Sequence, residues 1–164
     1  MSRVLKYEII DSPTKNYSKR LRVPTMIVVH HTADENVKNV LQWFHDPRSE
    51  RSAHFVIEKT GQIHQLVPEN GAAWHCRGEN QKSFGIEVVA KNRPMTQDQD
   101  IALEWLCGYL LCTYKLPYTA ITAHKFTEGA ATECPGVLFE KYDHVFGWAK
   151  TKFSRHFPVR GGVS

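Results

Sequence analysis

Three residues with metal-binding side chains stand at or near the ends of short apolar segments. His30 lies in the run MIVVHH, His124 closes AITAH, and Cys134 lies in the turn TECPG. Two imidazoles and a thiolate are donors that Zn²⁺ prefers, and three protein donors leave a fourth coordination position open for water. A histidine at a strand end is often structural, so the pattern alone leaves both roles open.

A carboxylate interrupts another apolar segment. Glu87 stands inside FGIEVVA (84–90), where a charged group is costly unless it is partnered. One interpretation is a buried glutamate paired with an arginine or lysine. The other is a general base, which takes a proton from water and passes it to a leaving amine.

The four cysteines allow a further interpretation. A chain of this size needs no disulfides, and Cys107 and Cys112 lie in an apolar helical stretch, where we expect small core residues. Cys134 as a nucleophile with His124 as its base would make a cysteine hydrolase. That scheme leaves His30 without a role.

Hydrophobic periodicity predicts the elements that must position these residues. Apolar runs predict buried strands, and one segment reads as two strands joined by a turn at Lys59-Thr60-Gly61. Helical spacing with capping residues predicts three helices. The strands are expected at 26–31, 84–90 and 120–124 with a hairpin over 53–67, and the helices at 34–46 (capped by Asp34), 96–115 (capped by Thr96) and about 137–153. This mixture predicts one α/β domain with a mixed central sheet flanked by helices.

Two aromatic positions are expected in the core of that domain. Trp43 and Trp105 read as core-facing residues of their helices. The residues expected on the same face as Trp105 are Ile101, Leu106, Tyr109 and Leu110. The segment 68–83 has no periodicity and predicts a long loop of the kind that often carries function.

Size and charge set broad limits. The 164 residues suit one domain, and 41% hydrophobic residues exclude wholesale disorder. A net charge of +4 suits acidic partners such as nucleic acid, anionic membranes or envelope polymers, and does not choose among them. We expect a basic N-terminal arm at 1–23, a catalytic domain at 24–155 and a loose tail at 156–164.

No apolar run has the length of a secretory signal or of a membrane span. We therefore expect a protein that is made in the cytoplasm and does not insert into a membrane. We also expect it to be a monomer.

Five segments in order resemble the N-acetylmuramoyl-L-alanine amidase family. They are VVHHTA (28–33), SAHFVIEKTGQIHQLV (52–67), AAWHCRGENQKSFGIEVV (72–89), AH (123–124) and ATECPG (131–136). The family includes phage lysozymes of the T7 kind, cell-wall recycling amidases and peptidoglycan recognition proteins. The resemblance runs from about residue 24 to residue 150.

The resemblance implies a zinc enzyme that cuts the amide bond between N-acetylmuramic acid and L-alanine in peptidoglycan. It assigns the zinc to His30, His124 and Cys134 and the general base to Glu87. It favours His30 over His31, whose side chain should point to the opposite face of the strand.

Two positions depart from the family pattern. Ala53 stands where the T7-type enzymes have a tyrosine, so that hydroxyl is missing and Glu87 gains importance. Thr132 stands where many members have a lysine that stabilises the developing oxyanion. A threonine hydroxyl still donates a hydrogen bond but supplies no charge.

The loop before Glu87 borders the substrate groove in the family. The resemblance therefore suggests Trp74, His75 and Asn80 as contacts to peptide or sugar, with an ordinary loop histidine as the alternative for His75. His54 is expected to brace the hairpin beneath the site.

The biological role stays open between two amidases and two other classes. A phage endolysin would lyse the host after release through a separately encoded pore, whereas a recycling amidase would act on soluble muropeptides in the cytoplasm. A non-catalytic peptidoglycan-binding module shares the fold but typically lacks a metal ligand. By family analogy, the basic arm is a candidate contact to a phage RNA polymerase.

Overall fold

The computed structural model describes residues 7–159 of the chain. The first six residues of the predicted N-terminal arm and the last five of the predicted tail lie outside this range. The strands are β1 (Ile9–Asp11), β2 (Tyr17–Lys19), β3 (Met26–His31), β4 (Phe55–Ile57), β5 (Ile63–Gln65), β6 (Gly71–Ala73), β7 (Ser83–Val88) and β8 (Ile121–Ala123). The helices are α1 (Val37–His45), α2 (Gln97–Tyr114) and α3 (Tyr142–Phe153), with 3-10 turns η1 (Pro47–Ser49), η2 (Asn80–Lys82), η3 (Tyr118–Ala120), η4 (His124–Phe126) and η5 (Gly136–Leu138).

Six strands form one mixed sheet in the order β1-β5-β4-β7-β3-β8. Only the β4–β5 hairpin pairs antiparallel, and the other neighbours in this sheet are parallel. The predicted α/β class and the mixed sheet are confirmed. The predicted hairpin over 53–67 and the strands at 26–31 and 84–90 lie where the apolar runs placed them.

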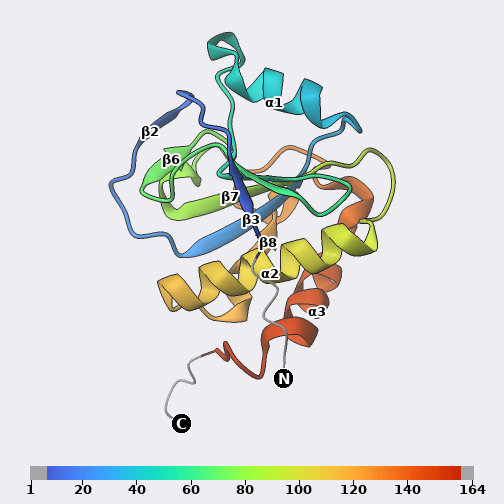
Figure 1. The fold of residues 1–164 in the computed structure, drawn as a ribbon. Helices are drawn as coiled ribbons and strands as arrows, with labels where there is room; N and C mark the ends of the chain where they lie inside the picture. Colours follow the sequence, from blue (N-terminus) through green and yellow to red (C-terminus); the bar gives the residue numbers. More distant parts are fainter. Residues whose placement is uncertain (1–6, 160–164) are drawn as a thin grey trace.

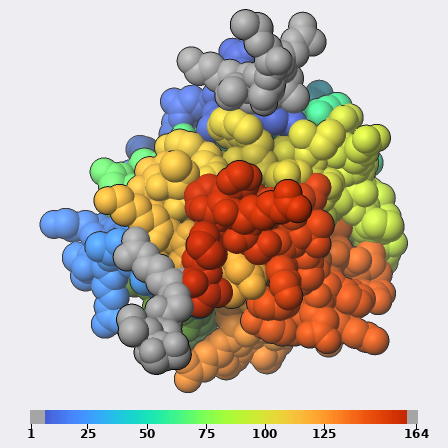
Figure 2. Space-filling view, turned by 90° about the horizontal axis from the view of Figure 1, so that it is seen from below, coloured from blue at the N-terminus to red at the C-terminus, as the bar shows by residue number. Residues whose placement is uncertain are grey.

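Helices cover both faces of this sheet (Figure 1). The amphipathic helix α1 lies over one face, where Val40 and Phe44 pack against Val56 of β4. On the other face α2 and α3 lie side by side over the larger core (Figure 2). Among residues 7–159, none of the helices combines the length and apolar character needed to cross a membrane.

Side chains alternate between the two sheet faces along the central strands, which separates core residues from candidate site residues. In β3 and β7 every second side chain enters the core beneath α2 and α3: Ile27, Val29, Phe84, Ile86 and Val88. Because successive side chains of a strand point to opposite faces, His30 and Glu87 project toward α1. The strand pattern therefore places both residues on one side of the sheet.

The helix ends follow side-chain capping, with one correction. Thr96 caps α2 in a capping box with Gln99, as predicted. The cap of α1 is Asn36, whose side chain accepts from the Lys38 N–H, and not Asp34. Asp34 instead accepts from the Asn36 N–H at 2.7 Å, so it fixes the turn before the helix.

The buried face of α2 also differs from the predicted one. Ile101 and Tyr109 are exposed, and Trp105 is only partly buried. The core-facing positions of α2 are Ala102, Leu103, Leu106, Cys107, Leu110 and Leu111. Cys107 is buried as expected, but Cys112 is exposed, so the expectation of a core residue there was wrong. Leu106 and Leu110 were placed on the correct side.

The segment before β3 is packed into the domain at two places. β1 adds a parallel strand beside β5, and β2 pairs antiparallel with β6, which forms inside the predicted loop 68–83. Arg20 follows β2 and donates to the backbone carbonyls of Glu69, Gly71, Gln81 and Ser83, and its guanidinium also lies 2.9 Å from His54 Nε2. The N-terminal segment therefore holds the loop that leads to β7.

Candidate metal centre

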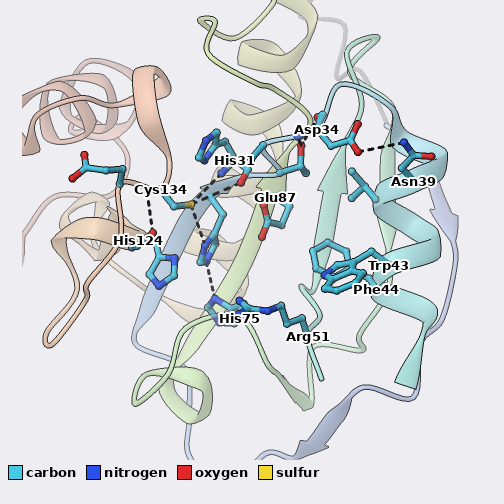
Figure 3. Close-up of a pocket in the computed structure, with 16 residues that line it drawn as sticks. His31, Asp34, Asn39, Trp43, Phe44, Arg51, His75, Glu87, His124 and Cys134 are labelled. Carbon is cyan, nitrogen blue, oxygen red and sulfur yellow. Dashed lines mark hydrogen bonds between the residues drawn. The ribbon is translucent and has the colours of Figure 1, made fainter. Parts of the chain in front are cut away.

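A cavity of about 850 Å³ opens on the α1 side of the sheet, at the carboxyl ends of β3 and β7. Figure 3 shows His75, Glu87, His124 and Cys134 facing it from different elements, with Trp43 across from them. Ligands of open α/β sheets bind outside the carboxyl ends of the strands. The position of the cavity follows from that architecture.

Three donors meet in this cavity. One atom each of His30, His124 and Cys134 lies within 4.8 Å of the others. His30 Nδ1 and Cys134 Sγ are 3.6 Å apart, and the rings of His30 and His124 have centroids 4.5 Å apart. His31 is not one of the three; it is the register partner of Val88.

Backbone contacts bring the second and third donors together. His124 follows directly after β8, which pairs with β3. The Lys125 N–H donates to the Cys134 carbonyl at 2.8 Å, so the two segments are tied one residue from His124. The His31 N–H lies 3.4 Å from Cys134 Sγ and donates to it. A backbone donor to sulfur orients a thiolate ligand.

The donor set fits Zn²⁺. Donors on a tetrahedral zinc lie about 2.0–2.3 Å from the ion, which places them roughly 3–4 Å from one another. The separation of His30 Nδ1 and Cys134 Sγ falls in that range. Burial lowers the pKa of His30 and of His124, so both rings are neutral lone-pair donors at neutral pH. Burial, with Glu87 nearby, raises the pKa of the Cys134 thiol, so its ionisation calls for a cation.

Glu87 lies beside the three donors. It is the register partner of His30 on the neighbouring parallel strand and lines the cavity. Burial raises its pKa to about 8, and Arg51 opposes that shift. Glu87 Oε2 is buried and has no hydrogen-bond partner among residues 7–159. A buried carboxylate oxygen without a protein partner is suited to accept a proton from water in the cavity.

Both ring nitrogens of His75 have hydrogen-bond partners within the protein. Its Nδ1 is 2.9 Å from His30 Nε2, and its Nε2 is 3.0 Å from Ser83 Oγ. Burial lowers its pKa well below the usual value, so the ring is neutral at neutral pH. His75 also lines the cavity, so its predicted contact to peptide or sugar stays a prediction.

Trp74 and Asn80 do not line the cavity. The indole N–H of Trp74 donates to Ser18 Oγ at 2.8 Å, toward the N-terminal segment. Asn80 Oδ1 accepts the N–H groups of His75 and Cys76 at 3.1 and 2.8 Å. The structure thus gives these residues a part in holding the loop, and their contacts to substrate stay predictions.

Thr132 lies at the cavity, whereas the two residues at the start of the hairpin, Ala53 and His54, are buried. Thr132 lines the cavity, and its oxygen accepts the Cys134 N–H at 3.1 Å, which leaves its hydroxyl proton free to donate. Ala53 is fully buried. His54 accepts the Gly85 N–H at Nδ1 and contacts the Gly71 carbonyl at Nε2, so it braces the hairpin.

Two cavity residues were missed. Trp43 lines the cavity with 54% of its surface exposed, so its predicted place in the core was wrong. Arg51 also lines the cavity and is exposed. An apolar residue next to the buried Phe44 reads as core from spacing alone. The strong amphipathicity of α1 would have separated them, because Val40 and Phe44 already fill the buried stripe.

The sequence matches the family model of N-acetylmuramoyl-L-alanine amidase over residues 20–137. A curated relative, N-acetylmuramoyl-L-alanine amidase A of Achromobacter lyticus, is 37% identical over 75 residues, which are 45% of this chain and 42% of the relative. The match thus spans less than half the length of that curated relative.

Solved structures match over most of the chain. The N-acetylmuramoyl-L-alanine amidase LysC of Clostridium intestinale URNW is 31% identical with a TM-score of 0.70, covering 90% of this chain and 97% of that one. The endolysin amidase LysCS of the same organism is 30% identical with a TM-score of 0.68, covering 90% and 95%.

Proposed function

Because the chain belongs to the N-acetylmuramoyl-L-alanine amidase family, we propose that it hydrolyses the amide bond between N-acetylmuramic acid and L-alanine in peptidoglycan. One observation carries the proposal. A three-donor cluster and a carboxylate with a raised pKa share one cavity at the ends of β3 and β7.

His30, His124 and Cys134 are the residues that would hold a zinc ion. When bound there, zinc supplies Lewis acidity that polarises the substrate carbonyl and lowers the pKa of water. The protein's part is to keep the two imidazoles neutral and to present the sulfur with a backbone donor already in place.

Glu87 is the general base of this proposal. Its Oε2 takes a proton from the attacking water and returns it to the nitrogen of the L-alanine leaving group. A carboxylate with a pKa near the working pH does both steps efficiently, because it is neither too weak a base nor too weak an acid. Desolvation in the cavity floor gives Glu87 that property.

Thr132 is the proposed hydrogen-bond donor to the oxyanion that forms at the cut carbonyl. Its oxygen accepts the Cys134 N–H, and because Thr132 lines the cavity its hydroxyl proton is free to donate there. A neutral donor contributes less than a lysine would, because it brings no charge. Trp43 supplies an apolar wall along which sugar or peptide can lie.

The direct test measures the bond that is cut. Purified protein incubated with sacculi should release peptides with a new amino terminus on L-alanine, and no new reducing sugar ends. A chelator should stop the release, and added Zn²⁺ should restore it. Reducing ends without free L-alanine termini would contradict the proposal.

Two alternative functions, a non-catalytic binding module and a cysteine hydrolase, predict different results in these assays. A non-catalytic module would bind sacculi without releasing peptide. A cysteine hydrolase needs a thiol with a lowered pKa, whereas burial raises that of Cys134. Blocking by iodoacetamide together with indifference to chelator would support that hydrolase.

We further propose an endolysin role over a recycling role. The endolysin LysCS is 30% identical over most of the chain, and a net charge of +4 favours the anionic wall polymer. Such a protein acts on the wall after release through a separate pore. Faster cleavage of intact sacculi than of soluble anhydro-muropeptides would support this role, and the reverse preference would indicate recycling. A monomeric state and a polymerase contact stay predictions.

A further inference from the structure

A series of hydrogen bonds leads from the three candidate metal ligands away from the cavity. His30 Nε2 is 2.9 Å from His75 Nδ1, and His75 Nε2 is 3.0 Å from Ser83 Oγ. Ser83 Oγ donates to the Glu79 carbonyl at 2.7 Å. Ser83 is fully buried and His30 nearly so. This series of hydrogen bonds is therefore shielded from water at both His30 and Ser83.

The direction of every proton in this series of hydrogen bonds follows from its far end. The Glu79 carbonyl can only accept, so the single hydroxyl proton of Ser83 is spent on it. Ser83 Oγ must then accept from His75, which puts the proton of the neutral ring on Nε2. His75 Nδ1 carries a lone pair and accepts the Nε2–H of His30.

The consequence is a fixed tautomer of His30. With the proton of His30 on Nε2, its Nδ1 lone pair faces Cys134 Sγ at 3.6 Å and the donor cluster. The opposite tautomer would put a proton between the donors. A metal ion would then have to displace that proton before His30 could bind.

Gly85 makes room for this arrangement. A Cβ built on Gly85 would lie 2.4 Å from Cγ and 2.6 Å from Nδ1 of the His75 ring. The ring thus packs directly on the backbone of β7, two residues from Glu87. The loop above is held by Asn80, which accepts the backbone N–H of His75.

We propose that His75 is a positioning residue, which acts with Ser83 to lock His30 in the tautomer whose Nδ1 lone pair faces the metal site. The inference rests on the proposed zinc site and adds a residue outside the three donors. Groups that orient metal-binding histidines typically change metal affinity by about 10–100-fold when removed. We expect a loss in that range for zinc when His75 is replaced.

The test reads the tautomer directly, without zinc and without substrate. Long-range ¹H–¹⁵N correlation spectra of metal-free, ¹⁵N-labelled protein show which ring nitrogen of each histidine carries the proton. The wild type should show His30 protonated at Nε2 and bare at Nδ1, and His75 protonated at Nε2. His30→Gln identifies the His30 signals. A wild-type His30 with its proton on Nδ1 would overturn the proposal.

Variants then test the cause. His75→Phe keeps a ring on Gly85 but removes the acceptor, so the His30 signals should report a mixture and zinc affinity should fall about 10–100-fold. Ser83→Ala keeps His75 and removes its fixed acceptor, and it should shift the His30 tautomer even if His75→Phe does not fold. His144→Phe, on the exposed side of α3, should change neither reading.

Two results would overturn the inference without touching the proposed function. One is unchanged zinc affinity with an unchanged His30 tautomer in His75→Phe. The other is a wild-type tautomer in Ser83→Ala. A wild type that neither binds zinc nor cleaves peptidoglycan would instead refute the proposed function, while the tautomer measurement would still stand.

Discussion

His30 and Glu87 are register partners on two neighbouring parallel strands, and both line the cavity on the sheet face that α1 covers. One is a donor of the candidate metal cluster and the other the candidate base. Their spacing is set by the backbone hydrogen bonds of β3 and β7, not by loops. The base and the cluster are therefore held at a fixed separation, which makes the two functions separable by mutation.

Glu87→Gln should abolish most of the amidase activity and keep the metal. The amide cannot take a proton from water, and loss of a general base typically costs about 10²–10⁴-fold in rate. Peptide release from sacculi measures the rate, and metal analysis measures bound zinc. Glu128→Gln, which alters an exposed carboxylate outside the cavity lining, should keep full activity. Undiminished release by Glu87→Gln would remove Glu87 from the mechanism.

Cys134→Ser should lose zinc and activity together. The hydroxyl that replaces the thiol is a poorer zinc donor and stays protonated at neutral pH. Metal content after dialysis against a weak chelator, measured beside peptide release, reports both losses. Cys112→Ser is the matched control, because Cys112 is exposed on α2 and lies outside the cluster. Full zinc occupancy in Cys134→Ser would contradict the assigned ligands.

Glu87 should also make the metal-free protein less stable at alkaline pH. Its folded pKa of about 8 lies above the ordinary value of 4.5, so the folded state holds the proton more tightly than the unfolded chain. The free energy of unfolding then falls as pH rises from about 4.5 to about 8. Denaturant unfolding of metal-free protein gives the difference in unfolding free energy between Glu87→Gln and the wild type. This difference should favour the variant by about 1–2 kcal/mol more at pH 8.5 than at pH 5.

The expected difference of about 1–2 kcal/mol is less than the free energy that corresponds to the whole pKa shift of Glu87, because the cavity is open to water. Glu140→Gln, at an exposed position, should show no such dependence on pH. A Glu87→Gln protein whose gain in stability is equal at both pH values would show that Glu87 titrates normally. Zinc should reduce the effect, since a nearby cation favours the ionised carboxylate.

Trp43→Ala should weaken substrate binding more than catalysis. The indole lines the cavity opposite the metal cluster but touches none of the donors (Figure 3). Loss of an exposed aromatic contact of about 1 kcal/mol corresponds to roughly a 5-fold rise in KM. Steady-state kinetics on a soluble muropeptide separates KM from kcat, and Trp43→Phe should recover much of the loss. A fall in kcat with unchanged KM would refute the proposal that Trp43 contributes to substrate binding.

Arg20→Ala should destabilise the fold by about 2–4 kcal/mol. Arg20 donates hydrogen bonds to four backbone carbonyls in partly buried surroundings, and its removal takes this donor from all four. Chemical denaturation measures the loss. Arg22→Ala, at an exposed position two residues away, should change stability by less than about 0.5 kcal/mol. Equal effects of the two substitutions would show that the Arg20 contacts contribute nothing.

Local patterns were enough for most of the fold. The run MIVVHH has the β-branched composition of a buried strand, and Thr96 with Gln99 carries a capping box in its sequence. These features depend on neighbours in the chain. The pairing of β1 with β5 and of β2 with β6 depends on segments more than 50 residues apart, which no local period encodes.

Part of the candidate site could also be predicted from local sequence. The three candidate donors and Glu87 could be named because each stands in a short, recognisable segment. The hydrogen bonds of His75, Asn80 and Trp74 could not be predicted, because all three lie in one loop whose direction is set by contacts to β2, Ser83 and the backbone. Trp43 was misplaced because the width of the buried stripe on α1 decides between two adjacent aromatic residues.

The donors of the metal cluster are far apart in the chain: Cys134 and His30 are separated by 104 positions. An unfolded chain therefore offers no preformed chelate, unlike a short motif with two cysteines in one turn. During synthesis, the emerging protein must complete β8 and the turn at Cys134 before a metal ion can be captured. Binding then comes after the sheet has formed, and its whole free energy is added to a fold that has already closed.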